Sequence, residues 1–153
     1  CLSYGPIGVC MTRGFTPRAL GEVAIRCRDY TAMVDFYENM IGLTVLEGGS
    51  RGVAPQRITF FHLGESFGGH TAVLALFEDV EGTAHNGTGS SLHHIALSLP
   101  WDEQDGAKTW LEAHGLPVRF QDFDWVGWRG LFTCDPDGNT VELVAAVPEG
   151  RTG

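Results

Sequence analysis

The sequence predicts an α+β fold made of two successive βαβββ modules, and three observations lead to that prediction. First, residues 22–25 (EVAI) resemble residues 94–97 (HIAL), which come 72 positions later, as expected for a duplicated structural unit. Second, each half contains apolar residues at strand spacing and a stretch in which they recur at helical spacing. Third, the sequence DPDGN at 135–139 is a strong turn between two apolar runs.

The repeat continues along both halves of the chain. The further matching stretches are residues 42–43 with 115–116, 57–60 with 129–132, and 74–77 with 141–144. Each residue of one half can therefore be compared with its counterpart in the other half.

The first half contains the five elements of one module in order. Val23, Ile25 and Cys27 alternate with other residues and predict a strand. A helix is expected next, capped by Asp29 or Thr31 and ended by Gly42. The remaining predicted elements are a short strand at 43–47, a polar loop opened by Gly48-Gly49, and strands at 58–63 and 71–77.

The second half repeats this order. We expect a strand at 92–99, followed by a helix at 102–114 that Gly115 ends. A short strand at 118–120 precedes two further strands at 131–133 and 140–145. The DPDGN turn joins these last two strands.

Length and patterning also predict the organisation of the domain. A chain of 153 residues is long enough for one compact domain with a real core. We expect a single domain at 20–147, with an N-terminal extension at 1–19 and a C-terminal tail at 148–153. Within the domain, module one covers about 20–80, a linker rich in Gly, Ser and Thr covers 81–91, and module two covers about 92–147.

Composition excludes several classes of function. The formal net charge is -9, and no cluster of Lys and Arg is present, so we expect neither nucleic acid nor an anionic membrane as a partner. No apolar run reaches the length that spans a membrane. The four cysteines show neither paired nor zinc-finger spacing. We interpret them as free thiols of a reducing compartment and expect a cytoplasmic protein.

Side chains that can bind a metal fall at equivalent positions of the repeat. Because side chains alternate across a strand, Glu22, His94 and Glu142 all point away from the predicted helices. Ala75 is the counterpart of Glu142 and carries no ligand atom. If the sheets enclose a shared cavity, the carboxylates need partners there, because an isolated buried charge is too costly to persist.

Two kinds of partner are possible for these carboxylates. One is arginine, although Arg26 lies about 13 Å from Glu22 along the strand, which leaves Arg129 as the better candidate. The other is a divalent cation bound by His94 and both glutamates, a donor set that suits Mn, Fe, Ni or Zn. The pattern alone leaves both open.

The order of the motifs resembles the vicinal oxygen chelate superfamily, which groups glyoxalase I, extradiol dioxygenases, fosfomycin- and bleomycin-resistance proteins and methylmalonyl-CoA epimerase. The resemblance covers residues 20–146. It is carried by the stretch from Val23 to Leu43, by His93-His94-Ile95-Ala96-Leu97, and by residues 135–143 (DPDGNTVEL). It implies mixed sheets curled into a cup around a shared cavity, with the helices outside.

The resemblance also implies where a metal would bind. Ligands come from the first and last strands of each module, which places them at Glu22, Ala75, His94 and Glu142. Ala75 breaks the four-ligand pattern of glyoxalase I, and what remains resembles the three-ligand pattern of extradiol dioxygenases and fosfomycin-resistance enzymes. Those proteins usually carry His at the position of Glu22. The cofactor implied is therefore a divalent metal (Mn, Fe, Ni, Co or Zn).

Two functions remain open at this point. One is a metal-dependent lyase, isomerase or dioxygenase that acts on a small substrate with vicinal oxygens, with Glu22 as third ligand or as general base. The alternative is a metal-free binding or resistance protein that sequesters a hydrophobic small molecule. In either case we expect a homodimer and a ligand pocket lined by Arg26, Trp125, Trp128 and Arg129. His93 is expected to face the helix side, whereas His62 or His70 could replace the ligand missing at Ala75.

Overall fold

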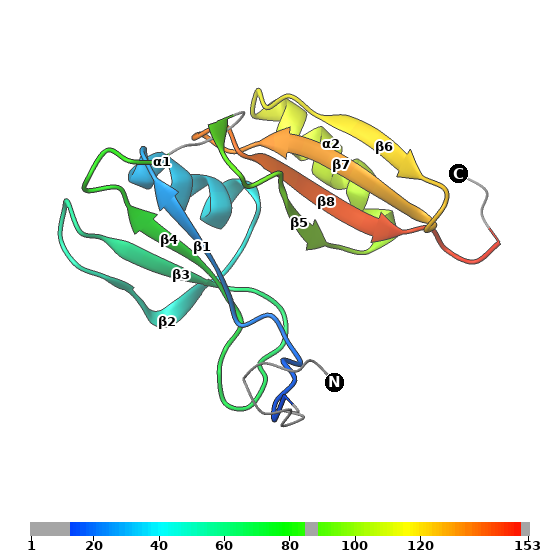
Figure 1. Cartoon of the computed structure of the whole chain (residues 1–153). Helices are drawn as coiled ribbons and strands as arrows, with labels where there is room; N and C mark the ends of the chain where they lie inside the picture. Colours follow the sequence, from blue (N-terminus) through cyan, green and yellow to red (C-terminus); the bar gives the residue numbers. More distant parts are fainter. Residues whose placement is uncertain (1–12, 85–88, 151–153) are drawn as a thin grey trace.

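A computed structural model describes residues 13–84 and 89–150. Cys1 and Cys10, most of the predicted N-terminal extension, part of the linker and the last residues of the predicted tail lie outside the described residues. The chain folds into two four-stranded mixed sheets, each with one α-helix (Figure 1). The predicted α+β fold of tandem βαβββ modules is confirmed.

Module one contains β1 (Glu22–Cys27), α1 (Tyr30–Asp35), a π-helical turn η1 (Phe36–Met40), β2 (Val45–Arg51), β3 (Ile58–His62) and β4 (Val73–Glu78). The side chain of Asp29 accepts a hydrogen bond from the backbone N–H of Ala32, so Asp29 is the cap of α1. Gly42 has a φ of 86°, which suits the residue that ends the helical segment.

Module two contains β5 (Ile95–Ser98), a 3₁₀ turn η3 (Trp101–Glu103), α2 (Gln104–Ala113), β6 (Arg119–Phe123), β7 (Trp128–Cys134) and β8 (Thr140–Ala146). The strand order is β1-β4-β3-β2 in the first sheet and β5-β8-β7-β6 in the second. In each sheet the first strand runs parallel to the last one, and all other pairs are antiparallel. The sheets are therefore topological copies of each other.

Strand alternation places the core on the helix face of each sheet, as predicted. Ile25 and Cys27 of β1 are buried, whereas Glu22 and Ala24 on the same strand are not. One apolar cluster combines residues of both modules, among them Met33, Tyr37 and Leu111. The opposite face of each sheet, which carries Glu142 in module two, is called the open face below.

Several predicted boundaries differ from the observed ones, among them the following three. Gly48-Gly49, expected to open a loop, lies inside β2, where the pairing with β3 shifts between Val45 and Ser50. The first helical segment ends in a π turn that periodicity does not reveal. β7 begins at Trp128, so Trp128 and Arg129 belong to a strand and not to the loop that precedes one.

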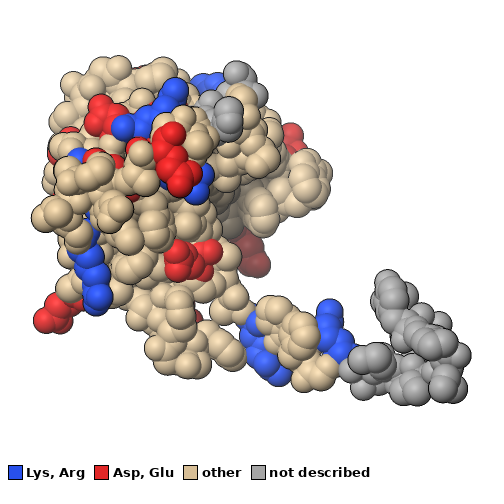
Figure 2. All heavy atoms as spheres, turned by 60° about the vertical axis from the view of Figure 1, so that its left-hand side comes forward, with Lys and Arg blue, Asp and Glu red and all other residues tan. Residues whose placement is uncertain are grey.

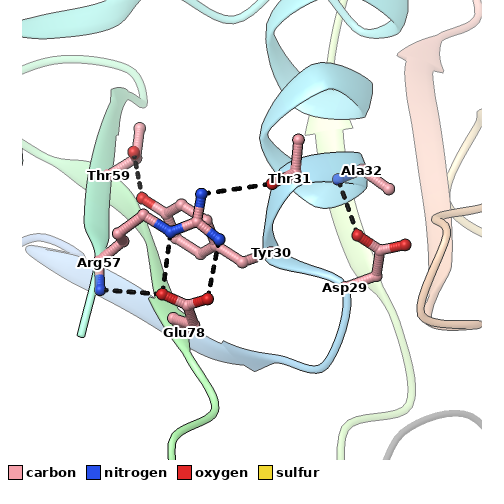
Figure 3. A network of polar contacts seen from close by, with 7 residues as sticks. All are labelled: Asp29, Tyr30, Thr31, Ala32, Arg57, Thr59 and Glu78. Atoms are coloured by element: carbon pink, nitrogen blue, oxygen red, sulfur yellow. Dashed lines mark hydrogen bonds and ion pairs between the residues drawn. The ribbon is translucent and has the colours of Figure 1, made fainter. Parts of the chain in front are cut away.

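An ion-pair network fixes the start of α1 on the helix face of module one (Figure 3). The Arg57 guanidinium lies over the ring of Tyr30 at 4.6 Å and donates hydrogen bonds to both oxygens of Glu78. The hydroxyl of Tyr30 lies 2.6 Å from that of Thr59. Hydrogen bonds from Arg57 hold the pKa of Glu78 below its ordinary value.

The modules of one chain meet at the DPDGN turn. The hydroxyl of Tyr37 donates to Asp135 at 3.0 Å, and the backbone N–H of Arg28 donates to Asp137 at 2.7 Å. Burial raises the pKa of Asp135, and it also raises the pKa of Tyr37. This contact joins the end of β1 to the turn before β8, and the two strands diverge from there (Figure 1).

Cys27 and Cys134 are free thiols, as expected for the cysteines that the structure describes. On the face seen in Figure 2, acidic and basic side chains are interspersed. No helix of residues 13–84 and 89–150 is long and apolar enough to cross a membrane.

Candidate metal centre

Glu142 lies in the middle of β8 on the open face of module two. Its strand neighbours are Ala96 on β5 and Phe132 on β7. Although it is charged in its ordinary state, the residue is only 5% exposed. A buried carboxylate of this kind needs a counter-charge or good hydrogen bonds.

His94 supplies that partner from the residue before β5. Its Nε2 lies 3.2 Å from Oε2 of Glu142. Among residues 13–84 and 89–150, the Glu142 carboxylate has no other ion-pair partner, and no Lys or Arg approaches it closely enough to pair. Two of the three predicted ligands are thus brought together, with their donor atoms side by side.

His93 was expected on the helix side but is exposed and contacts the ring of His94. The two Nδ1 atoms are 2.7 Å apart, and the tautomers of the two rings decide which nitrogen donates. When His94 accepts at Nδ1, its Nε2 carries the proton that Glu142 can accept; when His94 donates at Nδ1, its Nε2 is left unprotonated and can bind a cation placed between it and Glu142. A hydrogen-bonded second nitrogen is typical of histidines that bind metals.

Glu22 does not join this pair within one chain. It is exposed at the start of β1, about 20 Å of strand away from the end that contacts module two. No group of three or more His, Cys, Asp or Glu side chains capable of holding a metal occurs in the described part of the chain. The described residues of one chain thus supply two neighbouring candidate ligands, His94 and Glu142, and not a third.

The open face of module one is apolar at the position equivalent to Glu142. Ala75 is fully buried between Ala24 and Phe60. The rings of Phe60 and Phe77 meet edge to face, with centroids 6.5 Å apart. His62 pairs with Val73 at the end of β3, and His70 is exposed on the following loop, so neither brings a nitrogen into a metal-binding group at Ala75.

The predicted pocket residues divide between the two faces of the sheets. Arg26 lies on the open face of module one and donates to Thr83 at 3.3 Å, not to Glu22. Trp128 lies on the open face of module two beside Val144, where both line a hollow of about 360 Å³. Trp125 is 83% exposed at the tip of the β6–β7 turn.

Arg129 differs from its predicted position because it lies on the helix face. Strand alternation places it with Leu131, away from Glu142. Its guanidinium lies 3.8 Å from the centre of the Trp101 ring and donates to Oε1 of Gln104 at 2.7 Å. It therefore supports the start of α2 and can neither pair with Glu22 nor line the open face.

Sequence reasoning missed three residues around this site. Arg119 on β6 lies over the ring of Phe132 at 4.4 Å and brings a positive charge to the open face. Gly130 on β7 borders the Glu142 carboxylate. Gln104 is completely buried and donates to the carbonyls of Arg129 and Leu143. Comparison of the repeats could have drawn attention to Gly130, whose counterpart is Ile58.

A comparison with protein families shows which family the chain belongs to. The profile of the Glyoxalase/Bleomycin resistance protein/Dioxygenase superfamily matches residues 19–143. The chain belongs to this superfamily. A comparison with curated proteins found no match.

Solved structures of the glyoxalase superfamily share the fold. A lactoylglutathione lyase from Agrobacterium tumefaciens is 24% identical, covers 88% of this chain and 98% of its own, and gives a TM-score of 0.61. The fosfomycin resistance protein FosX from Listeria monocytogenes is 19% identical, with 84% and 92% covered and a TM-score of 0.60. That FosX, a point mutant, was solved with Mn(II) and 1S,2S-dihydroxypropylphosphonic acid.

A binding protein has the same glyoxalase-superfamily fold. TnmS3, an antibiotic-binding protein from a Streptomyces species, is 20% identical, with 88% of this chain and 99% of its own covered and a TM-score of 0.59. At these identities the likeness extends to the fold alone. The choice between enzyme and binder therefore depends on the residues of the site.

Proposed function

We propose that the protein is a divalent-metal-dependent enzyme acting on a small substrate with two neighbouring oxygens. The observation that carries this proposal is the pair of donor atoms on module two. Nε2 of His94 lies 3.2 Å from the buried carboxylate of Glu142, with no Arg or Lys paired to that carboxylate in the described chain. An imidazole and a carboxylate in this arrangement fit a cation such as Mn, Fe, Ni, Co or Zn.

We further propose that the third ligand is Glu22 of a second copy of the chain. The contact of Arg28 with Asp137 joins the modules of one chain at the far end of β1 from Glu22. The His94–Glu142 pair is therefore free to meet Glu22 only if module one comes from another molecule. A site of this kind would make a homodimer necessary for function.

Each residue then has a role at the bound substrate. The metal would supply Lewis-acid stabilisation of an oxyanion. Glu22, if it is not a ligand, would accept a proton as general base. Arg119 would attract an anionic group of the substrate, and Trp128 would exclude water from the hollow beside it.

Metal content and a metal titration test this proposal. Protein purified without chelator should contain a divalent metal, and Glu142→Ala or His94→Ala should abolish binding of Mn or Ni in calorimetric titration. Glu112→Ala is the matched control, because this exposed carboxylate pairs with Lys108 on α2 and should leave binding unchanged. If both site variants bound Mn or Ni with wild-type affinity, the proposed metal centre would be wrong.

Mixed dimers of Glu22→Ala and Glu142→Ala chains, isolated through two different tags, test the shared site. If each centre takes Glu22 from one chain and Glu142 from the other, the mixed dimer keeps one intact centre. Its metal content should be about half that of the wild type, whereas each pure variant should bind none. No recovery in the mixed dimer would exclude a centre shared in this way.

The alternative is a metal-free protein that sequesters a hydrophobic ligand. It is favoured by Ala75, which removes a fourth ligand position, and by the aromatic side chains Phe60 and Phe77 beside it. Absence of metal even after incubation with Mn, Ni and Zn would make this alternative the better one.

A further inference from the structure

Gly130 lies on the open face of module two, directly beside the Glu142 carboxylate. It pairs with Val144 on β8, and Phe132, two residues along β7, pairs with Glu142 itself. A Cβ built on Gly130 would overlap Oε1 of Glu142, and it would lie 3.0 Å from Cδ of the same residue. The φ of Gly130 is not positive, so its backbone does not require glycine. The need for glycine at this position comes from the neighbouring side chain.

Module one provides the contrasting case. Ile58 is the repeat counterpart of Gly130, and it pairs with Phe77 on the same face as Ala75. Module one therefore has a branched side chain at the strand position where module two has none. Glu142 occurs in the module that has glycine at the neighbouring strand position, and Ala75 occurs in the module that has isoleucine there.

We propose that Gly130 is a positioning residue that decides where the Glu142 carboxylate lies. Its missing side chain leaves the space over β7 in which Oε1 of that carboxylate lies, while Oε2 of the same carboxylate contacts Nε2 of His94, next to β5. The effect on metal affinity rests on the proposed function, whereas the packing relationship between Gly130 and Glu142 does not. Gly130 touches no substrate and acts only through Glu142.

A double-mutant cycle tests the packing relationship without any metal. Gly130→Ala should lower the melting temperature of the wild type by about 2–4 °C or more. In a Glu142→Ala background the same change should destabilise less, because the overlapping carboxylate is gone and only the contact with Phe132 remains. The ring edge of Phe132, 2.6 Å from the added Cβ, must move in both backgrounds and cancels in the cycle.

Metal titration tests the positioning role. Gly130→Ala should reduce the affinity for Mn at least about tenfold, within the range seen when a supporting residue is changed. Gly130→Ala/Glu142→Asp should recover part of that loss, because the shorter carboxylate avoids the added Cβ. Gly106→Ala is the control, since a Cβ at this position of α2 meets nothing within 4 Å.

The outcomes separate this inference from the proposed function. If the wild type binds no metal, the enzyme proposal fails, but the melting cycle still decides the role of Gly130. Equal destabilisation by Gly130→Ala in both backgrounds would overturn the inference, as would unchanged Mn affinity. If Gly130→Ala does not fold, folding of the Gly130→Ala/Glu142→Ala protein supports the inference, and failure of both proteins contradicts it.

Discussion

The two modules share their topology and helix-side support but differ on their open faces. In module one, Arg57 lies over Tyr30 near the start of α1, and in module two its counterpart Arg129 lies over Trp101 near the start of α2. The open faces differ because one carries Ala75 and the other carries Glu142. The repeat therefore preserves the residues that build the module, while the contact between His94 and Glu142 has no counterpart at Ala75 in module one.

The first prediction asks whether module one can accept the residue that module two carries. Ala75→Glu should destabilise the protein by about 3 kcal/mol or more, because it places an unpaired carboxylate at a fully buried position. Ile58→Gly should also destabilise, through lost packing. The loss of unfolding free energy in the double variant should be smaller than the sum of the two single losses by about 1–2 kcal/mol. The reason is that Ile58 no longer fills the space that the new carboxylate needs.

Chemical denaturation of the four proteins measures this coupling. Strict additivity would mean that Ile58 is not what excludes a carboxylate from module one. The difference between Ile58 and Gly130 would then not explain why only module two carries a carboxylate at this position.

Much of the fold could be predicted because it depends on local periodicity. The alternation of β1 placed Ile25 and Cys27 in the core, and both are buried. The same reasoning placed His94 and Glu142 on one face of neighbouring strands, where their donor atoms lie 3.2 Å apart. Strand pairing within a module follows from the order of its elements, so side chains within that module could be related correctly.

The rest depended on information that periodicity does not contain. Arg129 was assigned to a loop, but β7 begins one residue earlier, and alternation with Leu131 then directs it to the helix face. Gln104 is polar, so no apolar pattern marks it as buried. The separation of Glu22 from Glu142 depends on contacts between modules, such as Tyr37 with Asp135, which connect residues 98 positions apart.

The second prediction concerns the side chain that holds each arginine, which in module two is the neutral Gln104, with the exposed carboxylate of Asp105 3.7 Å from the guanidinium. Gln104→Ala should destabilise the protein by about 2–4 kcal/mol, because the carbonyls of Arg129 and Leu143 and the Nε of Arg129 all lose a partner. Gln104→Glu keeps an acceptor for Arg129 but loses both donors, so it should also be destabilising. Denaturant unfolding measures both values, and a loss below about 1 kcal/mol for Gln104→Ala would contradict this role.

The third and smallest expected effect concerns Glu78, the charged side chain that holds Arg57 in module one. Hydrogen bonds from Arg57 hold the pKa of Glu78 below its ordinary value of 4.5 in the folded protein. The pair therefore stabilises the fold above that pH, and its contribution is lost as the pH falls below about 4.5. Glu78→Gln should remove this part of the acid dependence, whereas Gln104 does not titrate and contributes none.

Melting temperatures of the wild type and Glu78→Gln between about pH 3 and pH 7 test this expectation. The difference between the two curves should be largest near neutral pH and should shrink as Glu78 becomes protonated. Taking the difference cancels the titration of the other carboxylates, including Asp135, whose raised pKa acts in the opposite direction. A difference that stays constant across the range would show that the Arg57–Glu78 pair contributes nothing through its charge. The two arginine supports would then be equivalent, and the modules would differ only on their open faces.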